Sequence, residues 1–172
     1  MASIELLTAA NFSENSLDSY IRKHEVKKVY RKSDGVYVLV EQPYVEDWDL
    51  TTRRRIARNI SSPDYITYIA IENDEVIGFI GLKKQLVGKR MILDMMHVSM
   101  SFRGKGLGRS LFEKGRAEAE KAGAEELYIS ACSSEETIAF YRAMGAEITS
   151  DPIKEMAEEE PFDLQMVCSV KR

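Results

Sequence analysis

The sequence predicts a three-layer α+β fold, in which a central, mixed but mostly antiparallel twisted sheet of about six or seven strands has helices on both faces. Three observations predict it. β-Rich segments separated by short turns fill the middle of the chain, an amphipathic helix interrupts them, and two further strands follow a second helix. Because the 172 residues contain no repeat, low-complexity segment or Gly/Ser linker, we expect one domain, 1–172.

The first 28 residues are predicted to form a strand and a helix. Residues 4–7 are a short candidate strand. Residues 11–28 are predicted to be helical, because Phe12, Leu17 and Tyr20 recur on one side.

A turn, a strand and a second helix are expected next. The turn is at residues 33–35, the strand covers 36–40, and the helix covers 50–60, beginning at Thr51 or Thr52. The intervening stretch is predicted to be a loop that either anchors its tryptophan on the core or holds a cationic amine by cation–π and charge contacts. Its aromatic and acidic residues are Tyr44, Glu46, Asp47 and Trp48.

The middle of the chain has the pattern of an antiparallel meander. Residues 65–71, 76–86 and 91–100 are rich in β-branched and apolar residues. Short polar turns at 73–75 and 87–89 join them, so each strand is expected to pair with the next in sequence.

The pattern then changes to a helical period. Apolar and small residues recur from Leu107 to Ala119, and Gly123 is expected to end this helix. A strand at 126–132 precedes a capping box, in which the Ser133 hydroxyl accepts a backbone N–H while Glu136 reaches back. The helix that follows is expected to end at Gly145. Strands near 146–149 and 162–170 then flank an acidic loop.

Composition and charge exclude several classes of function. A net charge of −4 argues against a nucleic-acid-binding protein, and the basic runs at 22–32 and 53–58 fit solvated helix faces better than binding patches. No apolar run is long enough for a membrane span, and the first residues do not resemble a secretory signal. Cys132 and Cys168 are too few for a disulfide framework or a zinc site, so we expect a cytoplasmic protein without a metal.

The strongest chemical signal lies where a strand runs into a glycine-rich turn that begins a helix. Glycines allow close approach of the backbone to a ligand, and the free N–H groups of a helix start attract anions. The spacing fits neither a P-loop nor a dinucleotide fingerprint. The residues of the turn are Arg103, Gly104, Lys105, Gly106, Leu107, Gly108 and Arg109.

The pattern Arg103-x-x-Gly106-x-Gly108 resembles the signature of the GNAT superfamily of N-acetyltransferases. The resemblance implies that the seven residues of the turn hold the pyrophosphate of acetyl-CoA, which is the co-substrate. It also implies a GNAT fold with two strands splayed apart at the cofactor cleft.

A second stretch, residues 134–146, resembles the next motif of that family. Ser134, Thr137 and Ala146 depart from the usual Asn, Ala and Phe. The resemblance implies that Tyr141 protonates the departing CoA sulfur as general acid and that Ser134 contacts the cofactor. The alternative is that Tyr141 has no catalytic role and is a buried residue of the core.

The strand at residues 93–98 corresponds to a bulged strand in the family. Met96, His97 and Val98 are expected to offer backbone groups to the pantetheine arm and the thioester. Asp94 is the leading candidate for the base, while His97 and a water relay stay open, because one residue of slip in the strand would reverse each side chain.

The sequence therefore predicts transfer of an acetyl group to a primary amine of a small molecule, by direct attack in a ternary complex. A peptide or protein acceptor and a CoA-binding sensor without turnover are the alternatives. The acidic residues Glu155, Glu158, Glu159, Glu160 and Asp163 either attract a cationic acceptor or form a plain charged loop. A homodimer and the role of residues 1–60 are left open.

Overall fold

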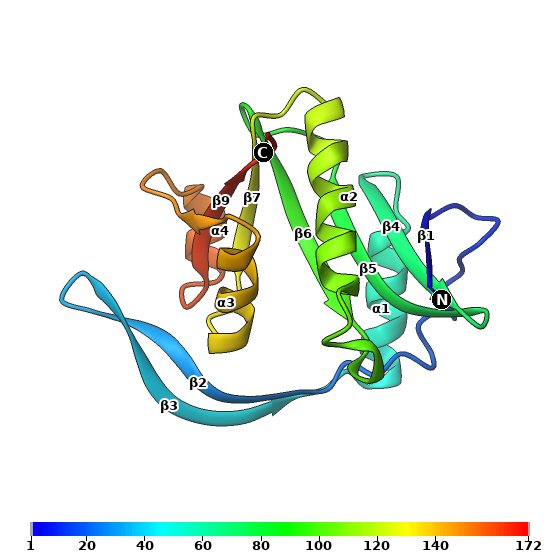
Figure 1. Ribbon diagram of the computed structural model, residues 1–172, viewed down its shortest axis with the longest axis horizontal. Helices are drawn as coiled ribbons and strands as arrows, with labels where there is room; N and C mark the ends of the chain where they lie inside the picture. Colours follow the sequence, from blue (N-terminus) through cyan, green and yellow to red (C-terminus); the bar gives the residue numbers. More distant parts are fainter. Residues whose placement is uncertain (1, 172) are drawn as a thin grey trace.

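The computed structural model describes residues 2–171 and has the predicted α+β architecture (Figure 1). Seven strands form the main sheet in the order β1-β4-β5-β6-β7-β9-β8, and every neighbouring pair is antiparallel except β6 and β7. The strands are β1 Ser3–Leu6, β4 Tyr65–Glu72, β5 Glu75–Lys83, β6 Arg90–Val98, β7 Glu126–Ala131, β8 Glu147–Ile148 and β9 Leu164–Ser169.

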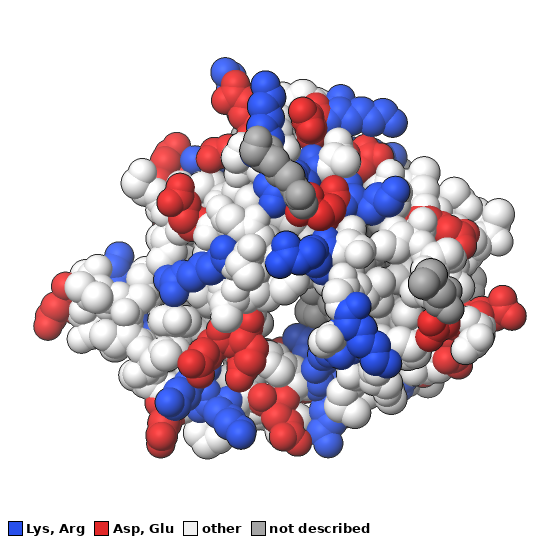
Figure 2. Space-filling model, viewed as in Figure 1, with Lys and Arg blue, Asp and Glu red and all other residues white. Residues whose placement is uncertain are grey.

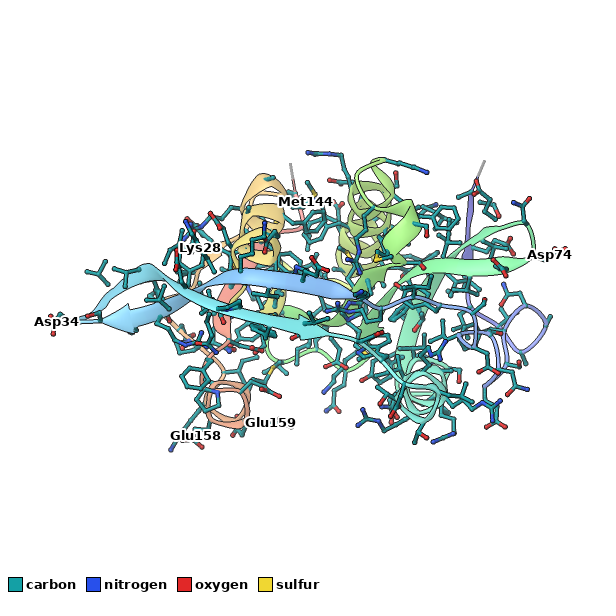
Figure 3. All side chains as sticks on the ribbon, turned by 90° about the horizontal axis from the view of Figure 1, so that it is seen from below. Lys28, Asp34, Asp74, Met144, Glu158 and Glu159 are labelled. Carbon is teal, nitrogen blue, oxygen red and sulfur yellow. The ribbon has the colours of Figure 1, made fainter. Side chains whose placement is uncertain are left out.

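Helices cover both faces of this sheet, as predicted. α2 (Leu107–Lys121) and α3 (Glu135–Ala143) lie on one face, while α1 (Leu50–Ile60) and α4 (Lys154–Glu159) lie on the other (Figure 3). A single turn of 3-10 helix, Met100–Phe102, precedes α2. None of the helices within residues 2–171 is both long and apolar enough to span a membrane.

The meander β4-β5-β6 follows the predicted turns. Asn73 and Asp74 both adopt positive φ at the turn between β4 and β5. β5 is buried on both faces, since Ile80 and Leu82 pack in the core under α2, whereas Phe79 packs in the core next to α1. The continuous apolar run of this strand thus reflects its central position in the sheet.

The predicted helix at residues 11–28 is wrong. Residues 8–19 form successive turns with backbone hydrogen bonds to the third residue along, and Ser, Thr and Asn side chains bond to nearby backbone groups. Such side chains compete with helix formation. Phe12, Leu17 and Tyr20 are nevertheless buried and pack against α1. Their spacing therefore indicated correctly that they are buried, although the segment is not a helix.

A separate two-stranded sheet follows, formed by β2 (His24–Ser33) and β3 (Val36–Glu46). The predicted turn is present at Asp34 and Gly35, but β3 extends beyond the predicted strand and includes most of the expected loop. This hairpin projects from the body of the molecule (Figures 1 and 3). It contacts the start of α3 through a bridge between Val29 and Ser134.

Two helix starts differ from the prediction. α1 is capped by Asp49, whose carboxylate accepts from the backbone N–H of Thr52 at 2.8 Å. α3 is capped by Ser134, whose hydroxyl accepts from the backbone N–H of Thr137. The Ser133 hydroxyl instead accepts from Arg31 at 2.8 Å, because the hairpin reaches this point. The acidic loop also contains α4, which was not predicted.

β6 and β7 are splayed apart, as the family resemblance implied. They pair only through residues Arg90–Ile92 and Glu126–Tyr128. The register between β5 and β6 shifts at Asp94, so the strand has a bulge there. The edge of β6 beyond this point faces an opening in the sheet, where a missing strand would otherwise pair.

Candidate active site

A cavity of about 510 Å³ lies beside the opening between β6 and β7. Figure 2 shows the surface hollowed between the start of α2 and α3. Its walls come from the end of β6, the turn before α2, α3 and the segment that leads into β2. The lining includes nine of the predicted site residues: Met96, His97, Val98, Arg103, Gly104, Gly106, Gly108, Arg109 and Tyr141.

The turn before α2 presents bare backbone to this cavity. Gly104 and Gly106 have φ values of 77° and 83°, which residues with side chains rarely adopt. A Cβ at either position would meet nothing within 4 Å, so open space adjoins both. Gly106 is the N-cap of α2 and supplies no capping side chain, which leaves the first N–H groups of the helix available to an anion.

Gly108 has a different role. A Cβ there would lie 3.2 Å from the Phe140 ring, so this glycine allows α2 and α3 to approach closely. Leu107 packs on the core, and the Lys105 ammonium lies over the Phe102 ring, 5.4 Å from its centroid. Neither of these last two residues lines the cavity.

The Arg103 side chain ties three segments together. Its Nε donates to the Val98 carbonyl at 3.0 Å, and its Nη1 donates to the Lys23 carbonyl at 2.6 Å. Burial and the nearby charge of Arg22 lower the pKa of Arg103 from its ordinary value. Its hydrogen bonds therefore fix the end of β6 and the segment before β2, in addition to the charge that it adds to the loop.

Tyr141 lies in the cavity wall on α3. The residue is 7% exposed, and its hydroxyl has no hydrogen-bond partner among the described residues. Burial, and then the charges of Cys132 and Asp163, raise the pKa of Tyr141 above its ordinary value. The phenol therefore keeps its proton at neutral pH and is able to donate it.

Ser134 is fully buried at the start of the same helix. Its hydroxyl donates to Thr137 Oγ1 at 2.7 Å in addition to accepting as the cap. Ser134 does not line the cavity.

His97 lies in an aromatic cluster. Its ring is 4.8 Å from that of Trp48 in an edge-on arrangement and 5.7 Å from that of Phe79. Burial, followed by the charges of Arg22, Arg103 and His24, holds the pKa of His97 well below its ordinary value. Its imidazole is therefore neutral at physiological pH. Trp48 also stacks on Tyr20, so the tryptophan is half-buried and packs against the core.

Asp94 lies at the β6 bulge, on the sheet face that carries α1. Its carboxylate accepts a hydrogen bond from the Tyr65 hydroxyl, and the Lys83 ammonium is 3.9 Å away. Asp94 is not part of the cavity lining. Within residues 2–171, no three His, Cys, Asp or Glu side chains are grouped to hold a metal ion.

Sequence reasoning missed part of the cavity wall. Arg22 and His24 line it, although they precede the glycine turn by about 80 residues, and Glu136 lies 3.7 Å from His24. Arg22 is buried and paired with Glu46 at 2.9 Å. No local pattern signals these contacts, because they depend on where the hairpin lies.

Comparison with known proteins agrees with this geometry. A model of the acetyltransferase (GNAT) family matches residues 33–146, which is more than half of the chain. A comparison with curated proteins found no match.

Solved structures with the same fold include a nourseothricin acetyltransferase, at 17% identity over 98% of both chains with a TM-score of 0.75. A putative streptothricin acetyltransferase from Bacillus anthracis str. Ames, in complex with acetyl coenzyme A, has 19% identity over 98% of both chains and a TM-score of 0.73. The ribosomal-protein-S18-alanine N-acetyltransferase from Escherichia coli has 16% identity, covers 100% of this chain and 96% of its own, and has a TM-score of 0.61.

The family match covers the glycine turn, the splayed strands and all of α3, and so includes most of the residues that line the cavity. The chain therefore belongs to the acetyltransferase (GNAT) family, acyltransferases that use acetyl-CoA as co-substrate.

Proposed function

We propose that this enzyme transfers the acetyl group of acetyl-CoA to a primary amine of a small molecule, by direct attack in a ternary complex. One observation carries the proposal: a single cavity contains the bare start of α2, the unpaired edge of β6 and the free hydroxyl of Tyr141. An anion site, a place for an extended arm and a proton donor are the three features that acetyl transfer from CoA needs.

The backbone of the turn before α2 is the proposed pyrophosphate site. The N–H groups at Gly106, Leu107 and Gly108 begin the helix, where the positive end of its dipole adds to their attraction for phosphate. Arg103, Gly104, Lys105 and Arg109 complete the binding segment by charge and by freedom of the backbone. Open space beside the two positive-φ glycines supports this fit.

The edge of β6 is the proposed site of the pantetheine arm. Met96, His97 and Val98 pair with β5 on one side, and β7 has separated from them on the other. Their outward backbone groups are able to pair with the arm as a neighbouring strand would. An N–H group of this segment supports the oxyanion that develops on the thioester carbonyl. Ser134 contributes by fixing the start of α3 beside the arm.

Two side chains move protons in the proposed reaction. Acetyl-CoA supplies the activated acetyl group and a thiolate leaving group. Tyr141 donates its proton to the departing sulfur as general acid, and its raised pKa keeps that proton in place until charge develops. Asp94, directly or through water, removes the proton of the attacking amine. Its place at the bulge beside the opening supports this role.

A small acceptor is proposed because two structures that match nearly the whole chain are named as a nourseothricin acetyltransferase and a putative streptothricin acetyltransferase. The match to an enzyme named as acting on a ribosomal protein makes a polypeptide N-terminus the second candidate. A cytoplasmic location is part of the proposal, and the unpaired Cys132 and Cys168 agree with a reducing compartment.

The proposal is tested with a panel of amines. Acetyl-CoA is expected to raise the Tm of the protein, whereas ATP and NAD are not. Small amines and N-terminal peptides are then compared by the rate at which free thiol is released. Turnover of peptides alone would select the second candidate. Stabilisation by acetyl-CoA without turnover of any amine would indicate a CoA sensor and refute the proposal.

A further inference from the structure

Arg22, in the segment before β2, is buried in the cavity wall with unused hydrogen-bond donors. The residue is 8% exposed and lines the cavity. Its Nη2 donates to Glu46 Oε2 at 2.9 Å, whereas its Nε is enclosed and has no hydrogen-bond partner in the described chain. Nη1 also makes no hydrogen bond to a described residue. Buried donors without partners are unfavourable, so this guanidinium has capacity for an oxygen of a ligand.

The backbone that carries Arg22 is held on both sides. The backbone N–H of Ile21 donates to the Ser99 hydroxyl at 3.2 Å. The Lys23 carbonyl accepts from Arg103 Nη1 at 2.6 Å. Because both neighbours are bonded to the end of β6 and the turn that follows it, Arg22 is held in the cavity wall before any ligand binds. A donor that is already in place loses little conformational freedom when it binds an oxygen.

Arg22 lies on the sheet face that carries α1. Its guanidinium carbon is over the Trp48 ring, 5.6 Å from the centroid. Trp48 contacts His97 and packs against the core cluster that contains the buried residues of α1. The proposed pyrophosphate site and Tyr141 belong to α2 and α3, on the other face. A ligand bonded to Arg22 therefore enters the opening from the side opposite to the proposed cofactor site, which is the side left for the acceptor.

The charge at this end of the cavity is positive. Arg22 and Arg103 supply two guanidinium groups, and Glu46 pairs with one of them. Burial, and then the charges of Arg22 and Arg103, lower the pKa of His97, and no carboxylate of the described chain offsets them at that ring. Glu136 lines the cavity at the start of α3, beyond this group. A positive wall favours a carboxylate over an ammonium group.

We propose that Arg22 binds a carboxylate that lies a few bonds from the reacting amine of the acceptor, so that the preferred acceptors are small amino acids. This inference rests on the proposed acetyl transfer and makes Arg22 a specificity-determining residue. The carboxylate accepts from the N–H groups that Glu46 leaves free. The same positive charge disfavours the ammonium form of the amine beside it, and only the neutral form attacks the thioester.

The test compares three amino acids with their amides and with alkylamines of equal length, at saturating acetyl-CoA. The amino acids are glycine, β-alanine and 4-aminobutyrate, and each rate is expressed per neutral amine. We expect kcat/KM of the best amino acid to exceed that of its alkylamine about tenfold or more, because the alkylamine leaves the guanidinium donors unpaired. The amide, which keeps an oxygen but not the charge, is expected to lie between them.

Two variants test the guanidinium itself. Arg22→Gln combined with Glu46→Gln removes the pair without leaving a carboxylate unpaired, and it is expected to reduce the preference for the amino acid to about onefold, mainly through KM. Arg22→Lys keeps the charge but not the planar donors, and it is expected to keep part of the preference. If the double variant does not fold, Arg22→Lys and Glu46→Gln alone carry the test. Glu46→Gln frees the guanidinium and is expected to keep or raise the preference.

Arg54→Gln combined with Asp18→Asn is the matched control. This pair is also an arginine and a carboxylate at 2.9 Å, but neither residue lines the cavity. The control is expected to retain the preference for the amino acid. An equal loss of kcat for every acceptor in Arg22→Lys would assign Arg22 to the thioester and overturn the inference. Equal rates for amino acid and alkylamine in the unmodified enzyme would also overturn it, and would leave the free N–H groups to an enclosed water.

A binding measurement separates this inference from the proposed function. Calorimetry gives the Kd of the best amino acid for the protein saturated with CoA, with and without Arg22→Lys. Weaker binding by the variant supports the inference even if no amine is acetylated, in which case the proposed function fails alone. Turnover of amines with unchanged amino-acid affinity in the variant refutes the inference alone.

Discussion

The two walls of the cavity are built in different ways. The donor wall is the turn at residues 103–109, a continuous segment whose chemistry is carried by backbone N–H groups. The opposite wall consists of side chains from separate elements, with Arg22 from the segment before β2, His24 from the start of β2 and Tyr141 from α3. Backbone N–H groups stay in place when neighbouring side chains are substituted. A wall made of side chains changes its shape and charge with each substitution. We therefore expect single substitutions to change the opposite wall more readily than the backbone groups of the turn.

The largest effect is expected from Gly106→Glu, which alters the donor wall. A side chain at φ 83° is strained, and the new carboxylate lies at the proposed phosphate site. We expect acetyl-CoA affinity to fall about 100-fold, measured by calorimetry. Gly88→Glu is the control, because Gly88 also has positive φ and open space but does not line the cavity. Equal loss of affinity in both variants would show that strain, and not the site, is responsible.

Tyr141→Phe separates chemistry from binding. The lost hydroxyl has no partner in the described chain, so the fold is expected to keep its stability. We expect kcat to fall about 100-fold with the Kd for acetyl-CoA unchanged. Tyr68→Phe is the control, since Tyr68 bonds to Glu118 at 2.6 Å away from the cavity. It should lose stability and keep kcat. An unchanged kcat in Tyr141→Phe would remove the general acid from the mechanism.

Asp94→Asn tests the proposed base with a smaller effect. The Asp94 carboxylate accepts a hydrogen bond from the Tyr65 hydroxyl and is paired with the Lys83 ammonium, and water is also able to take part in the proton transfer. We expect kcat/KM to fall about tenfold and acetyl-CoA affinity to stay the same. Tyr65→Phe, which removes the hydrogen bond but keeps the carboxylate, is expected to change the rate less. A normal rate in Asp94→Asn would assign proton removal to another group.

Gly108→Ala is expected to have the smallest effect. Its added methyl group lies 3.2 Å from the Phe140 ring, so α2 and α3 must separate slightly. We expect a loss of about 1 kcal/mol in the free energy of unfolding, measured by denaturant titration. Acetyl-CoA affinity should change by less than in Gly106→Glu. A larger loss of affinity than in that variant would show that the close packing of α2 on α3, and not the conformation at Gly106, controls cofactor binding.

The sequence predicted the main sheet and the glycine turn before α2 well, for a common reason. The β-branched and apolar runs of β4 and β5 and the glycine spacing before α2 are local patterns, and their structural meaning does not depend on distant contacts. The start of α3 was predicted one residue too early. Ser133 and Ser134 both satisfy the capping pattern, and the contact of Ser133 with Arg31 decides between them.

The residues before β3 were predicted incorrectly, because their structure depends on distant contacts. Their apolar spacing is compatible with a helix, but His24–Ser33 is a strand because it pairs with β3, and the preceding turns pack on α1. Secondary structure here follows from tertiary partners that lie later in the chain. The same partners bring Arg22 and His24 into the cavity.

By itself, the sequence determined the fold class, the family motif and the glycine turn that begins α2, because these depend on backbone conformations that a few neighbouring residues impose. Only the tertiary structure decided that Arg103 fixes two segments, that Trp48 packs against the core, and that Arg22 and His24 line the cavity. Burial and charge pairing are sums over residues far apart in the chain, and no local pattern contains them.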